Sequence, residues 1–317
     1  MLKIWVRLAA KIFCRKIIIN HHGLLKIDGP VLLACNHPNS FLDAILLDIL
    51  FEKPIWSLAR GDVFKKSFYS KLLTKLKMLP VYRSSEGVEN LETNYKTFDA
   101  CKEIFRNKGI VLMFSEGKCI NEWHLRPLMK GTARLAISSW QEGIDVRVLP
   151  VGINYSSFRR FGKNIFINFG NLITNDESKN IETDGRKNLA FNNRLQDELQ
   201  PLVFEISISD KKQQEKQLAC RPGINQKILL FFPAFLGLLF NAVLYLPVRY
   251  FTSTRPGISD HYDSVLIALL VLLYPFYLLG VTFILCLITG NWLGLLVLLV
   301  FPFTAWAYIQ LKGQLDK

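Results

Sequence analysis

The sequence predicts an α/β domain, built as a mixed sheet flanked by helices, followed by an α-helical membrane region. Between residues 23 and 170, short apolar runs alternate with longer stretches of helical periodicity, which is typical of a sheet covered by helices. From residue 228 onward, apolar stretches reach the ~20 residues that a membrane-spanning helix needs. We therefore divide the chain into an amphipathic interfacial helix (1–20), an α/β domain (21–205), a charged linker (206–227) and a membrane region (228–317).

The charge of the chain is concentrated in its water-facing part. The chain carries 39 Lys and Arg against 26 Asp and Glu, a formal net charge of +13. Residues 228–317 hold four of these basic and three of these acidic side chains, so residues 1–227 hold 35 and 23. A basic domain of this kind suits anionic partners, including the headgroups of a phospholipid membrane.

The first twenty residues form a basic amphipathic pattern. Lys3, Arg7, Lys11 and Arg15 recur every four residues, near one face of a helix, and apolar side chains fill much of the rest. A charge interrupts each short apolar run, unlike the core of a cleavable secretory signal. The pattern predicts a helix on the surface of an anionic leaflet. The alternative is a helix that packs on its own domain, with ordinary solvated lysines.

Four apolar runs bounded by Gly, Pro or Asn are typical of buried strands. They lie at residues 31–35, 109–114, 146–153 and 163–170. Helical periodicity fits residues 40–50, 64–76, 87–107 and 127–142. A polar loop is predicted at 174–190, a polar helix at 187–205 and a charged stretch at 210–217.

A histidine and an aspartate follow the first of these strands. Pro38 disfavours helix at His37, so the imidazole lies on the turn after the strand. Asn39 or Ser40 can cap the helix that follows, and Asp43 then lies in its first turn. There a carboxylate can orient the imidazole and leave its other ring nitrogen free to take a proton. The alternative is structural, because Ser40 and Asp43 also have the spacing of a capping box.

Other candidate ligands occur at the ends of later elements. Glu116 and Gly117 follow the second strand, and the carboxyl ends of such strands are where open α/β sheets bind ligands. Lys130 and Gly131 begin another helix, where a cation and exposed backbone N–H groups suit a phosphate or thioester oxygen.

Four short segments follow one another along the α/β domain. They are NHPNSFLD (36–43), LPVYR (79–83), FSEGK (114–118) and LPVGINY (149–155). In this order and at these separations they resemble the four blocks of the glycerolipid acyltransferases, which include the glycerol-3-phosphate and lysophosphatidic acid acyltransferases. The resemblance covers about residues 25–205 and implies a glycerolipid-acyltransferase-like mixed sheet. It also implies transfer of a fatty acyl chain from acyl-CoA or acyl carrier protein to a hydroxyl of glycerol-3-phosphate or lysophosphatidate, without a metal or cofactor.

The resemblance implies roles for individual residues. His37 would be the general base and Asp43 its orienting partner. Arg83 would hold the acceptor phosphate, a role that suits the bidentate geometry of a guanidinium. Glu116 and Gly117 would position the acceptor, and the fourth block would shape the acyl-donor side. Because a thioester is already activated, a base and oxyanion stabilisation suffice, and the chain has no Gly-x-Ser-x-Gly nucleophile motif.

Three features depart from the family's usual pattern. Five residues instead of four separate His37 from Asp43, which is similar to the fungal-type glycerol-3-phosphate and dihydroxyacetone phosphate branch. In the third block, Ser115 stands in place of a proline, and Lys118 and Cys119 replace threonine and arginine. A phosphate bound at this block would therefore depend on other cations, and Lys118 and Arg126 could supply the charge. Finally, this chain has a long apolar C-terminal region, which the smaller members of the family lack.

Three apolar stretches, at about 228–248, 265–288 and 292–311, are long enough to span a membrane. The second and third are expected to form a hairpin that turns at 289–291. Two prolines and an asparagine interrupt the first, so we expect it to dip into the membrane or lie flat. This topology keeps the four basic residues of the region inside, with the catalytic domain on the cytoplasmic face, whereas three spanning helices would place them outside. The four are Arg249, Arg255, Lys312 and Lys317.

The cysteines and the other histidines give weaker signals. The six cysteines are scattered, without the paired spacing of a disulfide framework or zinc site, so we expect reduced thiols. His124 is a possible substrate contact, and His261 falls in the short loop between two membrane segments.

Two other functions remain open at this point. One is acyl transfer to a different acceptor, such as another lysophospholipid or an amino-acid lipid. The other is a non-catalytic lipid-binding or tethering protein on the same fold. We expect no nucleic-acid partner, because no recognised binding motif is present and membrane anchoring accounts for the positive charge.

Overall fold

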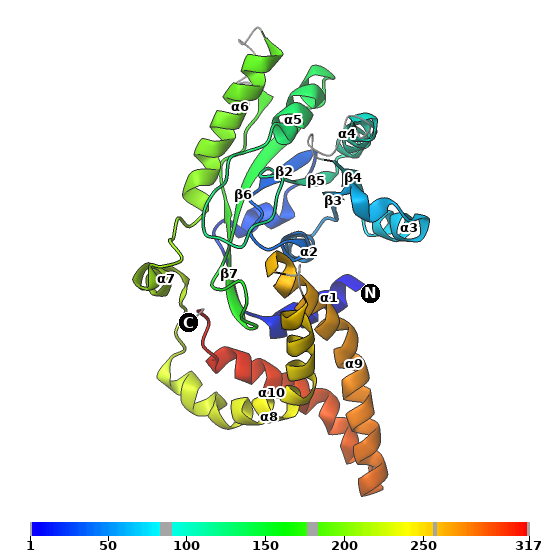
Figure 1. The fold of residues 1–317 in the computed structure, drawn as a ribbon, viewed down its shortest axis with the longest axis vertical. Helices are drawn as coiled ribbons and strands as arrows, with labels where there is room; N and C mark the ends of the chain where they lie inside the picture. The colour runs from blue at the N-terminus through cyan, green and yellow to red at the C-terminus, as the bar shows by residue number, and fades with distance from the viewer. Residues whose placement is uncertain (1, 83–90, 176–182, 256–258, 316–317) are drawn as a thin grey trace.

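A computed structural model describes residues 2–82, 91–175, 183–255 and 259–315. Its centre is a seven-stranded sheet with the order β1-β7-β6-β2-β5-β3-β4 (Figure 1). Neighbouring strands are parallel except for β6 and β7, which are antiparallel. The strands are β1 (Cys14–Ile19), β2 (Val31–Cys35), β3 (Ile55–Arg60), β4 (Met78–Val81), β5 (Ile110–Phe114), β6 (Arg147–Tyr155) and β7 (Lys163–Phe169). The predicted α/β class with a mixed, helix-flanked sheet is confirmed.

Helices cover both faces of the sheet. In β2, Leu33 packs with Leu46 of α2 on one face, whereas Leu32 packs with residues of α4, α5 and α6 on the other. All five residues of β2 are buried, as expected for a central strand of a parallel sheet. The helices of this domain are α1 (Leu2–Phe13), α2 (Phe41–Leu50), α3 (Ser67–Lys75), α4 (Leu91–Arg106), α5 (Gly131–Gln141), α6 (Asp184–Leu199) and α7 (Lys211–Leu218).

Several element boundaries differ from the predicted ones. The N-terminal helix ends at Phe13, and residues 14–19 form β1 instead of continuing the helix to residue 20. The isoleucines of β1 favour a strand once β7 supplies a partner. Helix α6 begins at Asp184, inside the predicted loop. The charged stretch after it forms α7, whose cap is Asp210.

The N-terminal helix α1 packs on the α/β domain through two of its basic residues. Lys3 donates to the carbonyl of Phe51 (3.0 Å), and Arg7 donates to the carbonyl of Ile49 (2.6 Å). These carbonyls lie at the C-terminal end of α2, where cations stabilise the helix. On another side of α1, Ile4 is 62% exposed and Leu8 is 50% exposed. Thus the helix docks on its own domain and still presents apolar side chains for a membrane surface.

The C-terminal region consists of α8 (Ile224–Thr254), α9 (Tyr262–Thr289) and α10 (Val297–Leu311). In the part of the chain that the structure describes, three helices are long and apolar enough to cross a membrane: α8, α9, and the combined segment Trp292–Leu311. Helix α8 continues through both of its prolines, and Figure 1 shows it bending part-way along its length. Gly237 of α8 lies so close to α10 that an added Cβ would be 2.0 Å from the Thr304 carbonyl oxygen.

The chain is tied to the α/β domain just before α8 and again in the last third of α8. Four residues before α8, Cys220 exchanges two hydrogen bonds of 3.0 Å with the Gln314 side chain, which also bonds Asn164 of β7. In the last third of α8, Tyr245 lies against Phe161, with 5.6 Å between the ring centroids. The start of α9 also contacts the domain, and α9 then extends away from it (Figure 1).

Candidate functional site

The site is built at the carboxyl ends of β2 and β5. These strands are parallel and aligned so that Cys35 pairs with Phe114, which places His37 and Glu116 on adjacent turns. The backbone N–H of His37 donates to a Glu116 carboxylate oxygen (2.8 Å). The imidazole stacks on the Phe114 ring, with 3.8 Å between centroids and 13° between planes. The predicted association of the first and third blocks is therefore present, through the backbone as well as the side chain.

Asp43 orients the His37 imidazole. The His37 Nδ1 atom lies 2.9 Å from Asp43 Oδ2, and the aspartate is fully buried while the histidine side chain is 18% exposed. The same carboxylate accepts the backbone N–H of Asn39 (2.9 Å) and the Tyr155 hydroxyl (2.6 Å). Because a carboxylate only accepts hydrogen bonds, this geometry favours a proton on Nδ1 and leaves Nε2 free to accept another.

Tyr155 is a part of the site that the sequence did not indicate. Strand β6 is parallel to β2, with Val151 opposite Cys35, and it continues four residues further to Tyr155. The Tyr155 ring is fully buried. Burial, together with the neighbouring Asp43 carboxylate, holds the pKa of the Tyr155 phenol well above its usual value. Tyr155 therefore stays a protonated donor to Asp43. In the structure the last residue of the fourth block bonds the aspartate, and the role of this block on the acyl-donor side stays a prediction.

Glu116 is buried and holds two backbone segments together. One carboxylate oxygen accepts the N–H of His37, and the other accepts the N–H of Arg126 (3.0 Å). Burial raises the pKa of the Glu116 carboxyl, and these two N–H donors oppose that increase. The observed contacts support the His37 turn. Its role in positioning an acceptor stays a prediction.

The remaining predicted ligands surround the turn after β5. Gly117 has a φ of +66°, which glycine adopts without strain, and an added Cβ would lie 3.0 Å from Met129 Cγ. Lys118 and Lys130 are exposed. Lys130 is followed by Gly131, the first residue of α5. Arg83 lies outside the described residues.

Ser115, which stands in place of the family's proline, ties that turn to α5. Its hydroxyl lies 3.0 Å from the Thr132 hydroxyl, and its carbonyl accepts the N–H of Met129 (2.7 Å). The N-terminus of α5 is therefore held beside the third block, as the predicted site requires. No direct contact between α5 and His37 is needed for this arrangement.

The capping box at the start of α2, which was the structural alternative for Ser40 and Asp43, is not formed. Ser40 is the N-cap residue, but its side chain caps no helix N–H, and its hydroxyl lies 2.6 Å from His261 Nδ1. Asp43 is committed to His37, Asn39 and Tyr155 instead. His261 thus lies at the site, although the sequence placed it only in a loop between membrane segments. Nothing local in the sequence marks this contact, because 221 positions separate the two residues.

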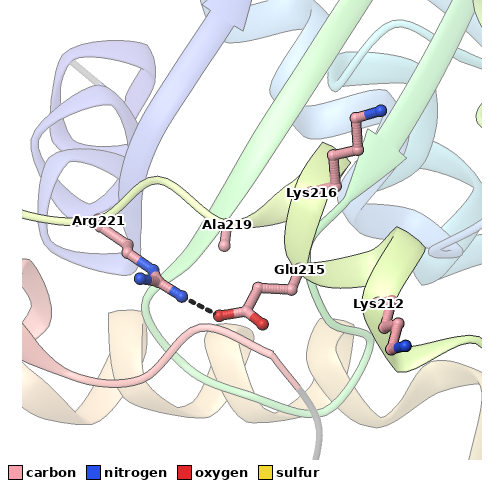
Figure 2. A pocket seen from close by; sticks show the side chains of 5 residues that line it. All are labelled: Lys212, Glu215, Lys216, Ala219 and Arg221. Carbon is pink, nitrogen blue, oxygen red and sulfur yellow. Dashed lines mark hydrogen bonds and ion pairs between the residues drawn. The ribbon is translucent and has the colours of Figure 1, made fainter.

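Other polar features lie away from the His37–Asp43 pair. The His124 ring pairs with Glu205 (2.5 Å) on the protein surface, and its contact with substrate stays a prediction. A surface hollow beside α7 is lined by two lysines and by Glu215 paired with Arg221 (Figure 2). It contains none of the predicted site residues. All six cysteines are free thiols, and among the described residues no group of three or more His, Cys, Asp or Glu could hold a metal ion.

Comparison with known proteins identifies the domain that carries this site. Residues 17–154 match the Acyltransferase family. The crystal structure of the 1-acyl-sn-glycerophosphate (LPA) acyltransferase PlsC from Thermotoga maritima is similar at 14% identity, with a TM-score of 0.40. The similarity covers 62% of this chain and 79% of that one. A search of curated proteins gave no match.

The matched segment begins in β1 and ends one residue before Tyr155, so it includes the first, second and third blocks and nearly all of the fourth. It contains His37, Asp43 and Glu116, which the structure brings into contact. Over residues 17–154 the chain therefore matches an acyltransferase domain, and it is an acyltransferase.

Proposed function

We propose that the protein transfers a fatty acyl chain from acyl-CoA or acyl carrier protein to a hydroxyl of glycerol-3-phosphate or lysophosphatidate at a membrane surface. The observation that carries this proposal is the His37–Asp43 pair at the carboxyl ends of the central strands. The pair sits in a domain that matches the Acyltransferase family, on a chain with three helices apolar enough for a membrane. A membrane-held enzyme can take its lipid acceptor directly from the leaflet.

The geometry supports a direct transfer with His37 as general base. The acceptor O–H gives its proton to His37 Nε2 while its oxygen bonds to the thioester carbonyl carbon. Asp43 stabilises the imidazolium that forms, because it already accepts the proton-bearing Nδ1. The tetrahedral oxyanion then expels the thiolate. The thiolate takes the proton from the imidazolium and leaves as the free thiol, which restores the neutral histidine.

Several cations around the third block suit a phosphorylated acceptor. Lys118 and Lys130 are exposed, and the Arg126 backbone is fixed by Glu116, so its side chain starts from a defined position. Arg126 also pairs with Glu122 (2.9 Å). Arg83 is assigned to the acceptor phosphate by resemblance to the family. A phosphate bound here would bring the adjacent glycerol hydroxyl toward His37.

Acceptor dependence of thiol release tests this function. The detergent-purified protein is given an acyl donor, either acyl-CoA or acylated acyl carrier protein, together with one of four acceptors. The acceptors are glycerol-3-phosphate, lysophosphatidate, lysophosphatidylcholine and a lyso amino-acid lipid. We expect free thiol to appear at least tenfold faster with one of the first two acceptors than with no acceptor. Turnover only with lysophosphatidylcholine or the amino-acid lipid would move the activity to a different acceptor class. Absence of turnover with all four would favour a lipid-binding or tethering role.

We also propose that α9 and α10 form a spanning hairpin, whereas α8 enters the membrane and returns on the same side. Support comes from Gln314, which bonds Asn164 of the α/β domain and also Cys220 just before α8, and from Tyr245 in the last third of α8, which lies against Phe161 of the domain. Arg249, Arg255 and Lys312 then lie on the domain's side, which the positive-inside tendency makes the cytoplasm.

Thiol labelling in intact cells tests this topology. Single cysteines are placed at Trp292, which is 81% exposed at the hairpin tip, and at Gly313 and Arg255, which are exposed near the domain. A membrane-impermeant maleimide is expected to label only W292C, and to label G313C and R255C after permeabilisation. The parent protein controls for reaction of the native cysteines. External labelling of G313C or R255C would contradict the proposed topology.

A further inference from the structure

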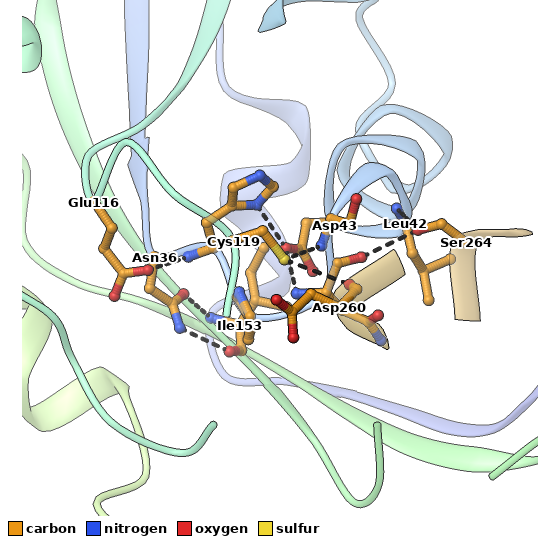
Figure 3. Close-up of polar contacts among 12 residues, drawn as sticks. Asn36, Leu42, Asp43, Glu116, Cys119, Ile153, Asp260 and Ser264 are labelled. Carbon is orange, nitrogen blue, oxygen red and sulfur yellow. Dashed lines mark hydrogen bonds and ion pairs between the residues drawn. The ribbon is translucent and has the colours of Figure 1, made fainter. Parts of the chain in front are cut away.

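The membrane region contributes a short segment to the active site. Residues 260–264, here called the docking turn, comprise the end of the α8–α9 connection and the first turn of α9, and they lie against the five residues between His37 and Asp43 (Figure 3). Three of those five residues bond to the docking turn. The contacts are Ser40 Oγ to His261 Nδ1 (2.6 Å), Asn39 Nδ2 to Asp263 Oδ2 (2.8 Å) and Leu42 N–H to Ser264 Oγ (3.1 Å).

One of these contacts caps the catalytic helix from outside. The first N–H groups of an α-helix have no partner within the helix, and the N-cap residue usually supplies one. In α2 the Ser40 side chain does not do so, and the Leu42 N–H donates to Ser264 instead. Ser264 Oγ also donates to the Asn39 carbonyl (3.3 Å). The first turn of the helix that carries Asp43 is therefore capped by Ser264, a residue of the membrane region.

The backbone of Ser40 is strained, and the docking turn holds it. Ser40 has φ 54° and ψ −137°, a region that only glycine adopts readily. Its N–H donates to Cys119 Sγ (2.9 Å), and the Cys119 thiol in turn lies 3.8 Å from the Asp260 carbonyl. Its hydroxyl bonds His261. Such strain costs on the order of 1–3 kcal/mol and persists only where the surroundings impose it.

A buried ion pair keeps the docking turn in place. Asp263 pairs with Lys163 at the start of β7, and both side chains are fully buried. Breaking such a pair is costly because it leaves an uncompensated buried charge. The docking turn is thus fixed to the sheet on one side and to the His37 turn on the other.

We infer that His261 is a positioning residue for the transfer reaction. Acting through Ser40, it holds the strained turn that sets the distance between His37 and Asp43. The membrane region is then a working part of the acyltransferase, in addition to any anchoring role. This inference rests on the proposed function for its kinetic readout, while the geometry of the turn can be tested without substrate.

The test compares His261→Ala, His261→Asn and His22→Ala in the full-length protein. The asparagine amide offers a polar atom at the place of Nδ1, and His22 is an exposed histidine outside the site that serves as matched control. For His261→Ala we expect kcat to fall about tenfold, because loss of one hydrogen bond that holds the strained turn corresponds to about that change in rate. The KM values for the acyl donor and for the acceptor should stay within twofold of the parent. Amide exchange in a peptide covering residues 38–43 should accelerate about tenfold. His261→Asn should recover at least half of both quantities, and His22→Ala should match the parent.

Three results would overturn the inference. The first is a parental kcat together with parental amide exchange in His261→Ala. The second is a rise of KM in His261→Ala without a loss of kcat. The third is a loss of kcat that parallels a lower thermal midpoint and that His261→Asn does not restore. If the parent shows no transfer to any acceptor, the proposed function fails, and the exchange comparison alone then decides whether His261 holds the turn.

Discussion

Replacing His37 with alanine is expected to lower the rate of acyl transfer by about 10³-fold while leaving the protein folded. The acceptor hydroxyl would lose the base that takes its proton, and Asp43 cannot substitute because it is fully buried. The fold should survive, since the imidazole lies on a turn and makes one side-chain hydrogen bond and one ring contact. Thiol release at saturating acceptor measures the loss, and the thermal midpoint checks the fold.

His22→Ala provides the control for loss of a histidine at the protein surface. Its side chain is exposed and lies outside the predicted site. Parental turnover in His37→Ala would rule out general-base catalysis by this residue. A loss of only tenfold or less would also contradict it, because a positioned general base contributes about 10²- to 10⁴-fold.

Replacing Asp43 with asparagine is expected to lower kcat by about 10³- to 10⁴-fold, for a different reason. An amide has one oxygen, and it would have to satisfy His37 Nδ1, the Asn39 N–H and the Tyr155 hydroxyl, which now share a carboxylate. The amide N–H₂ would face one of these donors, so the imidazole would turn or adopt the other tautomer. Nε2 would then carry the proton and could not accept one.

Stability separates the two substitutions. Asp43→Asn should also lower the free energy of unfolding by about 1–3 kcal/mol for a buried donor left without an acceptor, whereas His37→Ala should change it little. Circular dichroism during thermal or urea unfolding measures this difference. Asp62→Asn is a matched control, because Asp62 pairs with Arg60 at an exposed position where ion pairs contribute little. Turnover of Asp43→Asn near the parental rate would exclude the orienting role.

The central strands and the contact between His37 and Asp43 could be predicted because their signals are local. Strand β2 is a continuous apolar run, Pro38 fixes the turn after it, and Asp43 follows within one helical turn. Strands farther from the centre of the sheet were harder to predict. Strand β3 is only partly buried, with Ser57 and Arg60 inside its pattern, and β1 depends on a partner, β7, that lies about 150 residues away in the chain. Their pairing, more than their composition, makes them strands.

The contacts between the site and the start of α9 could not be predicted either, because the partners are far apart in the sequence. His261, Asp263 and Ser264 read as a polar loop between apolar helices, and their partners lie more than 220 positions earlier for Asn39, Ser40 and Leu42. The contact between Tyr155 and Asp43 was also hard to predict, because 112 positions separate the two residues. Tyr155 could be assigned to the end of a strand, but only the register of β6 against β2 shows that it reaches Asp43.

The longer spacing between His37 and Asp43 acquires a physical interpretation in this structure. Five residues separate the pair, and Asn39, Ser40 and Leu42 face the membrane region. The same five residues include the strained Ser40. The extended turn therefore serves as a platform on which the α8–α9 connection docks, and the pair keeps its 2.9 Å contact.

The most direct test of His37-catalysed acyl transfer follows a ¹³C-labelled acyl chain from thioester to product. The detergent-purified parent and His37→Ala proteins are incubated with labelled acyl thioester and either glycerol-3-phosphate or lysophosphatidate, and the lipids are analysed by mass spectrometry. The predicted result is labelled ester on a phosphorylated acceptor with the parent and about 10³-fold less with His37→Ala. Equal labelling by the two proteins, or no labelled ester with either acceptor, would contradict it.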